Sequence, residues 1–196
     1  MRTVIVFNHP NGGSYCNAIL QSITQGLQIA GHEVDLMHLD NDGFNPAMSK
    51  ADLKAFVDHQ PIDPQVIGYN ERLKKADHLI FIFPIWWDIM PATTKGFIDR
   101  VLGPGVMYDH HPRGFGLVPL LKNLNSITII TTMNKPKILY ALLIGNLIRR
   151  VMLKSVFKTM GYKNLHWISF TSVRSVNREK RVQWLSNLET RFSKLK

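Results

Sequence analysis

Short apolar runs alternate with amphipathic stretches along this chain of 196 residues. Runs such as Thr3–Phe7 and His78–Phe83 are apolar at nearly every position, which is typical of parallel strands buried on both faces. Stretches such as Tyr15–Ala30 place apolar residues three or four positions apart, as a helix with one buried face does. The alternation of the two patterns predicts an α/β fold with helices on both faces of a parallel sheet.

The same patterns place every expected element, in one domain that spans residues 1–196. The predicted strands are Thr3–Phe7, Glu33–His38, His78–Phe83, Ser126–Thr131 and Leu165–Phe170. The predicted helices are Tyr15–Ala30, Lys50–Val57, Gln65–Ala76, Pro91–Leu102, a basic helix within Ile138–Met160, and Asn177–Leu195. Five strands connected in this way suit the order 2-1-3-4-5, in which ligands bind at the carboxyl ends of the strands, beside the first and third.

Three loops should therefore build a site, namely Asn8–Asn17, Pro84–Pro91 and Thr131–Lys137. The first loop holds Gly12-Gly13-Ser14 and opens a helix, so its backbone N–H groups can approach a phosphate. It carries neither the Gly-Lys-Ser/Thr of a P-loop nor a G-x-G-x-x-G fingerprint. An ordinary tight turn with Ser14 as the helix cap is an equally good interpretation of the residues alone. The position after the first strand favours phosphate.

The second loop carries two adjacent tryptophans, Trp86 and Trp87, after Pro84 and Ile85. A planar heteroaromatic ligand needs an apolar wall and backbone donors at its edge, and this loop can supply both. The alternative is that the tryptophans cap the core. The third loop begins with Thr131-Thr132, which offers hydroxyl groups, but the residues alone favour a helix cap and turn.

Composition narrows the function classes further. The net charge of +10 favours anionic partners, such as a phosphorylated cofactor, nucleic acid or an acidic membrane surface, although solubility alone explains it. We expect no nucleic-acid partner, because the chain has no arginine-rich tract, RNA-binding signature or zinc finger. The histidines show no metal-binding spacing, and the side chains of the adjacent His110 and His111 diverge, so we expect no metal site.

The remaining sequence features suggest a cytoplasmic protein. Cys16 is the only cysteine, which excludes an internal disulfide framework and suits a reducing compartment. The N-terminus runs straight into the first strand without a signal peptide. The longest apolar run, Ile138–Ile148, is too short to span a membrane.

One ordered set of motifs resembles the flavodoxin-like NAD(P)H:quinone oxidoreductases, the family that includes mammalian quinone reductase. The set runs from Ala76-Asp77 through the strand to Pro84 and Trp86-Trp87, then Pro91-Ala92, and ends with Lys95–Val101 (Lys-Gly-Phe-Ile-Asp-Arg-Val). The resemblance implies a flavodoxin-like three-layer sandwich and a homodimer. It also implies a flavin, FMN or FAD, that takes hydride at N5 from NAD(P)H and passes it to a quinone-like acceptor in ping-pong fashion. The short chain favours FMN.

The resemblance also assigns site residues by position. Those implied to surround the flavin phosphate are His9, Ser14, Tyr15 and Asn17. Those implied to line the flavin ring are Pro84, Ile85, Trp86, Trp87, Thr131 and Thr132. No catalytic residue is certain, and the candidates are Tyr140 and Tyr108, the latter beside an acceptor pocket that a dimer partner completes.

The chain departs from the family's pattern at two places. Met133-Asn134 stands where the family often has Gly-Gly, and the Tyr and His that some members present to the hydride step have no clear counterpart near Pro136–Gly145.

The same family includes ancillary flavoproteins of potassium-efflux systems, so the basic helix within Ile138–Met160 leaves a membrane-protein partner as an alternative. A one-electron carrier is disfavoured, because such carriers are strongly acidic whereas this chain carries +10.

Overall fold

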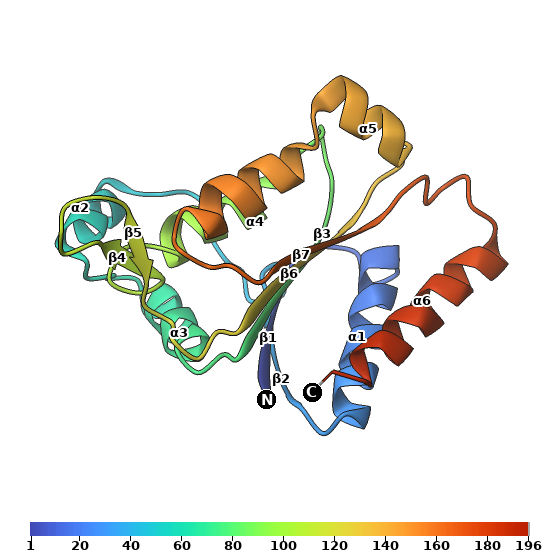
Figure 1. The fold of residues 1–196 in the computed structure, drawn as a ribbon, viewed down its shortest axis with the longest axis horizontal. Helices are drawn as coiled ribbons and strands as arrows, with labels where there is room; N and C mark the ends of the chain where they lie inside the picture. The colour runs from blue at the N-terminus through green and yellow to red at the C-terminus, as the bar shows by residue number, and fades with distance from the viewer. Residues whose placement is uncertain (196) are drawn as a thin grey trace.

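A five-stranded parallel sheet forms the centre of the computed structural model, which describes residues 1–195 (Figure 1). Its strands are β1 (Arg2–Phe7), β2 (Glu33–His38), β3 (His78–Pro84), β6 (Ser126–Thr132) and β7 (Leu165–Phe170). They lie in the order β2-β1-β3-β6-β7, and every neighbouring pair is parallel. This arrangement confirms the predicted order 2-1-3-4-5 and the flavodoxin-like α/β sandwich.

The apolar runs become strands because both faces of the sheet are covered. Every residue of β3 is buried, so a continuous apolar sequence is the one that can occupy this position without leaving polar groups unpaired. His78 is the polar exception, and its Nε2 lies 2.9 Å from the hydroxyl of Thr128 on β6.

Two helices that run in the same direction, α1 (Tyr15–Ile29) and α6 (Arg178–Phe192), cover one face of the sheet side by side (Figure 1). They approach closely at Gly26, where a Cβ would overlap the backbone of Glu189. Leu188 and Phe192 are buried as the helical pattern predicts. Val182, on the same helix, is 56% exposed.

The opposite face carries α2 (Lys50–Asp58), α3 (Pro64–Leu73), α4 (Ala92–Val101) and the π-helix η1 (Arg149–Lys158). The basic helix expected within Ile138–Met160 is in fact two helices, α5 (Lys137–Ile144) and η1. Gly145 and Asn146 both adopt left-handed backbone conformations, with φ of +76° and +53°, and this ends α5. The sequence pattern missed the break because apolar residues continue on both sides of it.

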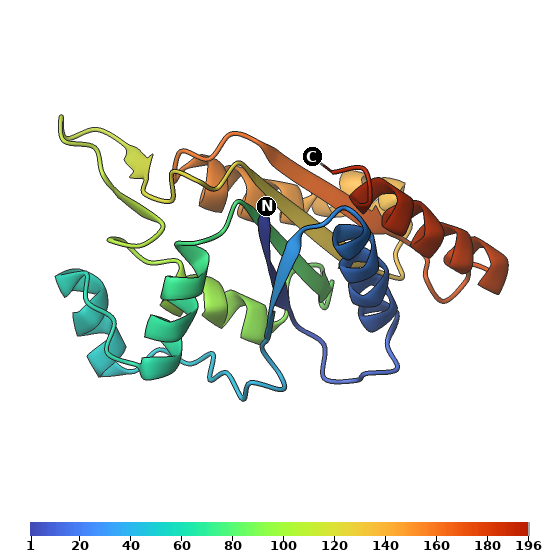
Figure 2. The ribbon, with the colours of Figure 1, turned by 90° about the horizontal axis from the view of Figure 1, so that it is seen from below.

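Beyond α4 the chain forms a small antiparallel pair, β4 (Tyr108–His110) and β5 (Leu117–Pro119), which the sequence did not predict. It projects away from the sheet (Figure 2), and Tyr108 and Leu117 line a pocket together with Phe56 of α2. None of the helices in residues 1–195 combines the length and apolar composition that crossing a bilayer requires.

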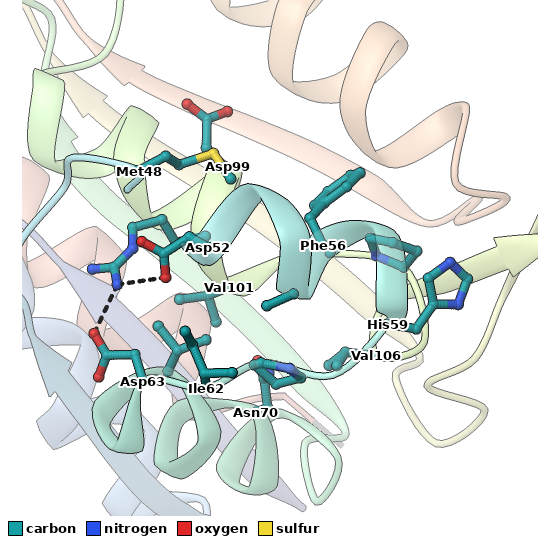
Figure 3. A pocket seen from close by; sticks show the side chains of 16 residues that line it. Met48, Asp52, Phe56, His59, Ile62, Asp63, Asn70, Asp99, Val101 and Val106 are labelled. Carbon is teal, nitrogen blue, oxygen red and sulfur yellow. Dashed lines mark hydrogen bonds and ion pairs between the residues drawn. The ribbon is translucent and has the colours of Figure 1, made fainter. Parts of the chain in front are cut away.

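A small pocket lies where α2, α3 and α4 meet (Figure 3). Arg100, whose side chain is only 5% exposed, bridges Asp52 at 3.1 Å and Asp63 at 2.7 Å there. Arg100 Nη1 donates to the carbonyl of Asn45 at 2.6 Å, whereas both carboxylates bind its Nη2. Burial alone would raise the pKa of the Asp52 and Asp63 carboxyls, but hydrogen bonds lower both, from Ser49 and Arg100 at Asp52 and from Arg100 and backbone N–H groups at Asp63. Arg100 therefore links α4 to α2 and to the start of α3.

Candidate functional site

The three loops predicted to build a site lie together at the carboxyl edge of the sheet. The backbone N–H of Asn8 donates to the carbonyl of Ile82 at 3.0 Å, and that of Ile85 donates to the carbonyl of Thr132 at 2.8 Å. The Cys16 sulfur lies 3.3 Å from the Thr132 hydroxyl. The edge therefore joins the first, second and third loops through direct hydrogen bonds.

Side chains within the first loop hold its shape. The Asn11 N–H donates to His9 Nδ1 at 3.1 Å, and the Gly13 N–H donates to Asn11 Oδ1 at 2.8 Å. Asn17 Nδ2 donates to the Gly12 carbonyl at 2.7 Å, while Ser14 Oγ accepts from the Asn17 N–H and so caps α1. The predicted cap is thus confirmed, and Asn17 acts first on the loop itself.

His9 offers a neutral donor to this loop. Because its Nδ1 accepts a hydrogen bond from Asn11, the ring proton resides on Nε2, which has no partner among residues 1–195. Burial lowers the pKa of His9, although Asp40 and the Asn11 backbone act in the opposite direction. The ring is therefore neutral at neutral pH.

The N-terminus of α1 opens toward the same space. Its first turn holds no acidic residue, and a Cβ placed on Gly12 would meet no atom within 4 Å. The first N–H groups of a helix lack partners within the helix and carry the positive end of its dipole, so this terminus can hold an anion. Tyr15 contributes its backbone only, because its hydroxyl donates to the Arg181 carbonyl at 2.9 Å and its ring packs on Phe170 and Trp184.

The second loop is a tight hairpin that presents the two tryptophans. Trp86 and Ile89 exchange backbone hydrogen bonds of 2.9 and 3.1 Å around Trp87 and Asp88, whose φ angles are +48° and +65°. Such a turn normally carries Asn-Gly, so Trp-Asp here is strained. Trp86 is 46% exposed and Trp87 is 99% exposed, so neither caps the core. The hairpin instead holds an aromatic surface open to solvent.

Two side chains from the third loop and α5 support this hairpin. Lys135 forms a 2.6 Å ion pair with the Asp88 carboxylate. The Tyr140 hydroxyl donates to the Asp88 carbonyl at 2.9 Å and accepts from the Ile148 N–H at 3.1 Å. Tyr140 is fully buried, and burial raises its pKa. Because both roles of its hydroxyl are in use, the structure places Tyr140 as a positioning residue rather than beside the reactants.

The other residues predicted to line a ring divide into exposed and buried ones. Pro84 ends β3 and is buried, whereas Ile85 is partly exposed. Thr131 is fully buried and its hydroxyl accepts from Trp167 Nε1 at 2.9 Å, so it cannot face a ligand. Thr132 is partly exposed and remains available.

Asn8 is a structural centre of the site that the sequence reasoning missed. Its side chain is buried, donates from Nδ2 to Asp40 at 2.9 Å and accepts from the Thr94 hydroxyl at 2.8 Å. These bonds join the ends of β1 and β2 to the first turn of α4. The available signal was a polar residue directly after the apolar run of β1.

Tyr108 lies outside the loop cluster, and Cys16 contributes to it only through its contact with Thr132. Tyr108 follows α4, whose ten residues extend about 15 Å away from the edge. Burial raises the pKa of the Cys16 thiol to about 11, so the thiol stays protonated at neutral pH. Residues 1–195 contain no group of three or more His, Cys, Asp or Glu side chains able to hold a metal ion.

Comparisons with known proteins find a matching family model and several relatives of this chain. A family model described as "Flavodoxin-like fold" matches residues 1–192. An "Uncharacterized NAD(P)H oxidoreductase" of Haemophilus influenzae is 26% identical over 183 residues, covering 92% of this chain and 89% of that protein. "NAD(P)H dehydrogenase [quinone] 1" of Rattus norvegicus is 30% identical over 125 residues, which cover 56% of this chain and 46% of the rat protein. The match therefore spans about half the length of that relative.

Among solved structures, the NAD(P)H:quinone oxidoreductase from Methanothermobacter marburgensis superposes with a TM-score of 0.88. The superposition covers 100% of this chain and 99% of the other, at 24% identity. At that identity the likeness concerns the fold.

Proposed function

The chain belongs to the family described by the flavodoxin-like fold, and from this we propose that it is a flavin-dependent NAD(P)H oxidoreductase that reduces a quinone or a similar small acceptor. The names of its relatives support oxidoreductase activity with NAD(P)H, and the rat relative's name supports a quinone as acceptor. These names give no support to the alternative of an ancillary subunit on a potassium-efflux system.

The observation that carries the proposal is the pairing of an anion site with an aromatic surface at one edge of the sheet. The acid-free N-terminus of α1 suits a phosphate, and the hairpin presents an exposed Trp86. The rings of His9 and Trp86 lie 6.2 Å apart, so the two features border one space. A flavin mononucleotide combines a terminal phosphate with a planar ring, and it fits this arrangement.

Each residue then has a proposed role toward that group. His9 Nε2, Ser14 and the first N–H groups of α1 hold the phosphate, while Asn17 fixes the loop. Trp86, Trp87, Ile85 and Thr132 border the ring, and the hairpin brings backbone N–H groups to its edge. When bound, the flavin supplies two-electron hydride chemistry between NAD(P)H and the acceptor. The protein holds the reactants in order on one face and supplies preorganised N–H donors toward developing negative charge.

Partners follow from the same reasoning. FMN is favoured over FAD because the chain is short, and the net charge of +10 suits the phosphorylated NADPH. We propose a homodimer in which Tyr108, placed beyond α4, completes the acceptor pocket of the other subunit. Sedimentation velocity would show a dimer, and a monomer with full activity would remove Tyr108 from the site.

The test is FMN binding to a matched pair of variants. Ser14 and Ser49 both cap a helix, α1 and α2 respectively, but only Ser14 borders the proposed phosphate site. In a titration followed by quenching of FMN fluorescence, Ser14→Ala should weaken binding about tenfold, the value of one charged hydrogen bond. Ser49→Ala should leave the affinity unchanged. Equal effects of both changes, or no saturable binding by the unmodified chain, would refute the proposed site.

A further inference from the structure

Helix α5 exposes an apolar face that nothing within residues 1–195 covers. Its eight residues, KILYALLI, are apolar on both sides, with Lys137 as the only charged residue. Tyr140 points inward and is fully buried. The outward residues and their exposures are Ile138 at 67%, Leu139 at 43%, Leu142 at 75% and Leu143 at 73%. A helix that is apolar all round is normally buried all round, so this face has a partner outside the chain.

The chain around α5 carries only positive charge. From residue 110 to residue 178 the sequence holds no Asp or Glu and eleven Lys and Arg. Lys137 begins α5, and Arg149 and Arg150 begin η1; all three are exposed. An Arg150 nitrogen would lie 3.1 Å from a Cβ on Gly145, so its side chain rests against the end of α5. None of the three forms an ion pair with a residue of the described chain.

We propose that the α5 face, defined as Ile138, Leu139, Leu142 and Leu143, docks the protein on the surface of an anionic lipid bilayer. A short helix with an exposed aliphatic face and flanking Lys and Arg is suited to the boundary between acyl chains and anionic headgroups. At about 12 Å long, α5 lies in that boundary without crossing it. A second copy of this chain fits this face less well, because a symmetric contact here would bring Lys137, Arg149 and Arg150 of both copies together.

The docked face lies directly behind the candidate site. Tyr140, on the inner side of α5, donates a hydrogen bond to the Asp88 carbonyl of the tryptophan hairpin, and Lys135 just before α5 pairs with the Asp88 carboxylate. Docking would thus bring the site to the membrane surface, where a lipid-dissolved quinone is available as acceptor. That consequence rests on the proposed function, whereas the docking itself does not.

Flotation with lipid vesicles tests the docking without any redox assay. The purified full chain is mixed with phosphatidylcholine vesicles, with or without about one third phosphatidylglycerol, and the bound fraction is measured at low and high salt. We expect binding to the anionic vesicles that high salt weakens. Leu142→Ser/Leu143→Ser should lower the partition coefficient about tenfold. Ile29→Ser/Val182→Ser, which changes two exposed aliphatic residues on α1 and α6, should leave it within about twofold.

Charge variants separate the electrostatic part. Arg149→Gln/Arg150→Gln should weaken binding to the anionic vesicles about 25-fold, whereas Lys50→Gln/Lys54→Gln on α2 removes the same charge and should have a much smaller effect. The proposal is overturned by absence of binding to the anionic vesicles, or by equal binding of the Leu142→Ser/Leu143→Ser variant. It is also overturned if that variant turns a dimer into a monomer in sedimentation velocity, because a second copy then covers the face. Failure of the docking would leave FMN binding and NAD(P)H oxidation untouched.

Discussion

Removing the Tyr140 hydroxyl should destabilise the protein in proportion to the two hydrogen bonds it makes. The change Tyr140→Phe keeps the ring, which is fully buried, and deletes one oxygen. That oxygen donates to the Asp88 carbonyl at 2.9 Å and accepts from the Ile148 N–H at 3.1 Å. The perturbation is therefore confined to polar contacts.

The loss of these two hydrogen bonds should lower the free energy of unfolding by unequal amounts. Asp88 sits in a partly exposed turn, so water can replace the lost donor there. Ile148 is fully buried, and its N–H would be left without a partner, which costs about 1–3 kcal/mol. We expect the free energy of unfolding to fall by about 2 kcal/mol. With a urea m-value of about 2 kcal/mol/M, the midpoint of unfolding should fall by about 1 M.

Urea unfolding followed by circular dichroism measures this change, with Tyr108→Phe as the matched control. The Tyr108 hydroxyl has no hydrogen-bond partner within residues 1–195, so its removal should change stability by less than about 0.5 kcal/mol. FMN affinity should also fall in Tyr140→Phe, because the tryptophan hairpin loses a support. A midpoint unchanged by Tyr140→Phe, or lowered equally by both changes, would refute the assigned role.

Two further predictions concern stability. In Gly96→Ala the new Cβ would overlap Pro46, so the free energy of unfolding should fall by about 3 kcal/mol. In Gly68→Ala, at an exposed position of α3, the new Cβ would meet nothing within 4 Å, and the free energy of unfolding should rise by roughly 0.5–1 kcal/mol. Equal melting temperatures of the two variants would contradict this packing. Burial lowers the pKa of His78 to about 4 from 6.5, so the neutral ring stabilises the fold fully above pH 6.5. That stability, up to about 3 kcal/mol, should be lost as the pH falls from 6.5 to 4, and urea midpoints of His78→Gln should lose this pH dependence; a variant that keeps it would contradict the assignment.

The centre of the sheet could be predicted from the sequence, because β1, β3 and β6 are buried on both faces and are therefore largely apolar runs. The short pair β4 and β5 could not, since three-residue strands give too few positions to show alternation. The separation of α5 from η1 also escaped prediction. The apolar pattern runs through Gly145-Asn146, and only the left-handed backbone at both residues ends the helix.

The site loops could be located because the carboxyl ends of parallel strands share an edge, but the orientation of each side chain could not. Tyr15 turns away to α6 because the Arg181 carbonyl and two aromatic rings meet it there. Thr131 faces inward because alternate residues of a strand point to opposite faces, and its hydroxyl meets Trp167. Asn8 drew no attention since its partners, Asp40 and Thr94, are distant in sequence.

The most direct test of the proposed activity is an anaerobic titration of the FMN-loaded protein. NADPH should bleach the flavin absorption in a one-to-one ratio, and a water-soluble quinone should then restore it in a single two-electron step. Initial rates at several fixed quinone concentrations should give parallel double-reciprocal lines, as a shared site requires. A protein that takes up no flavin, or whose bound flavin NADPH and NADH leave oxidised, would contradict the assignment of this edge as a redox site.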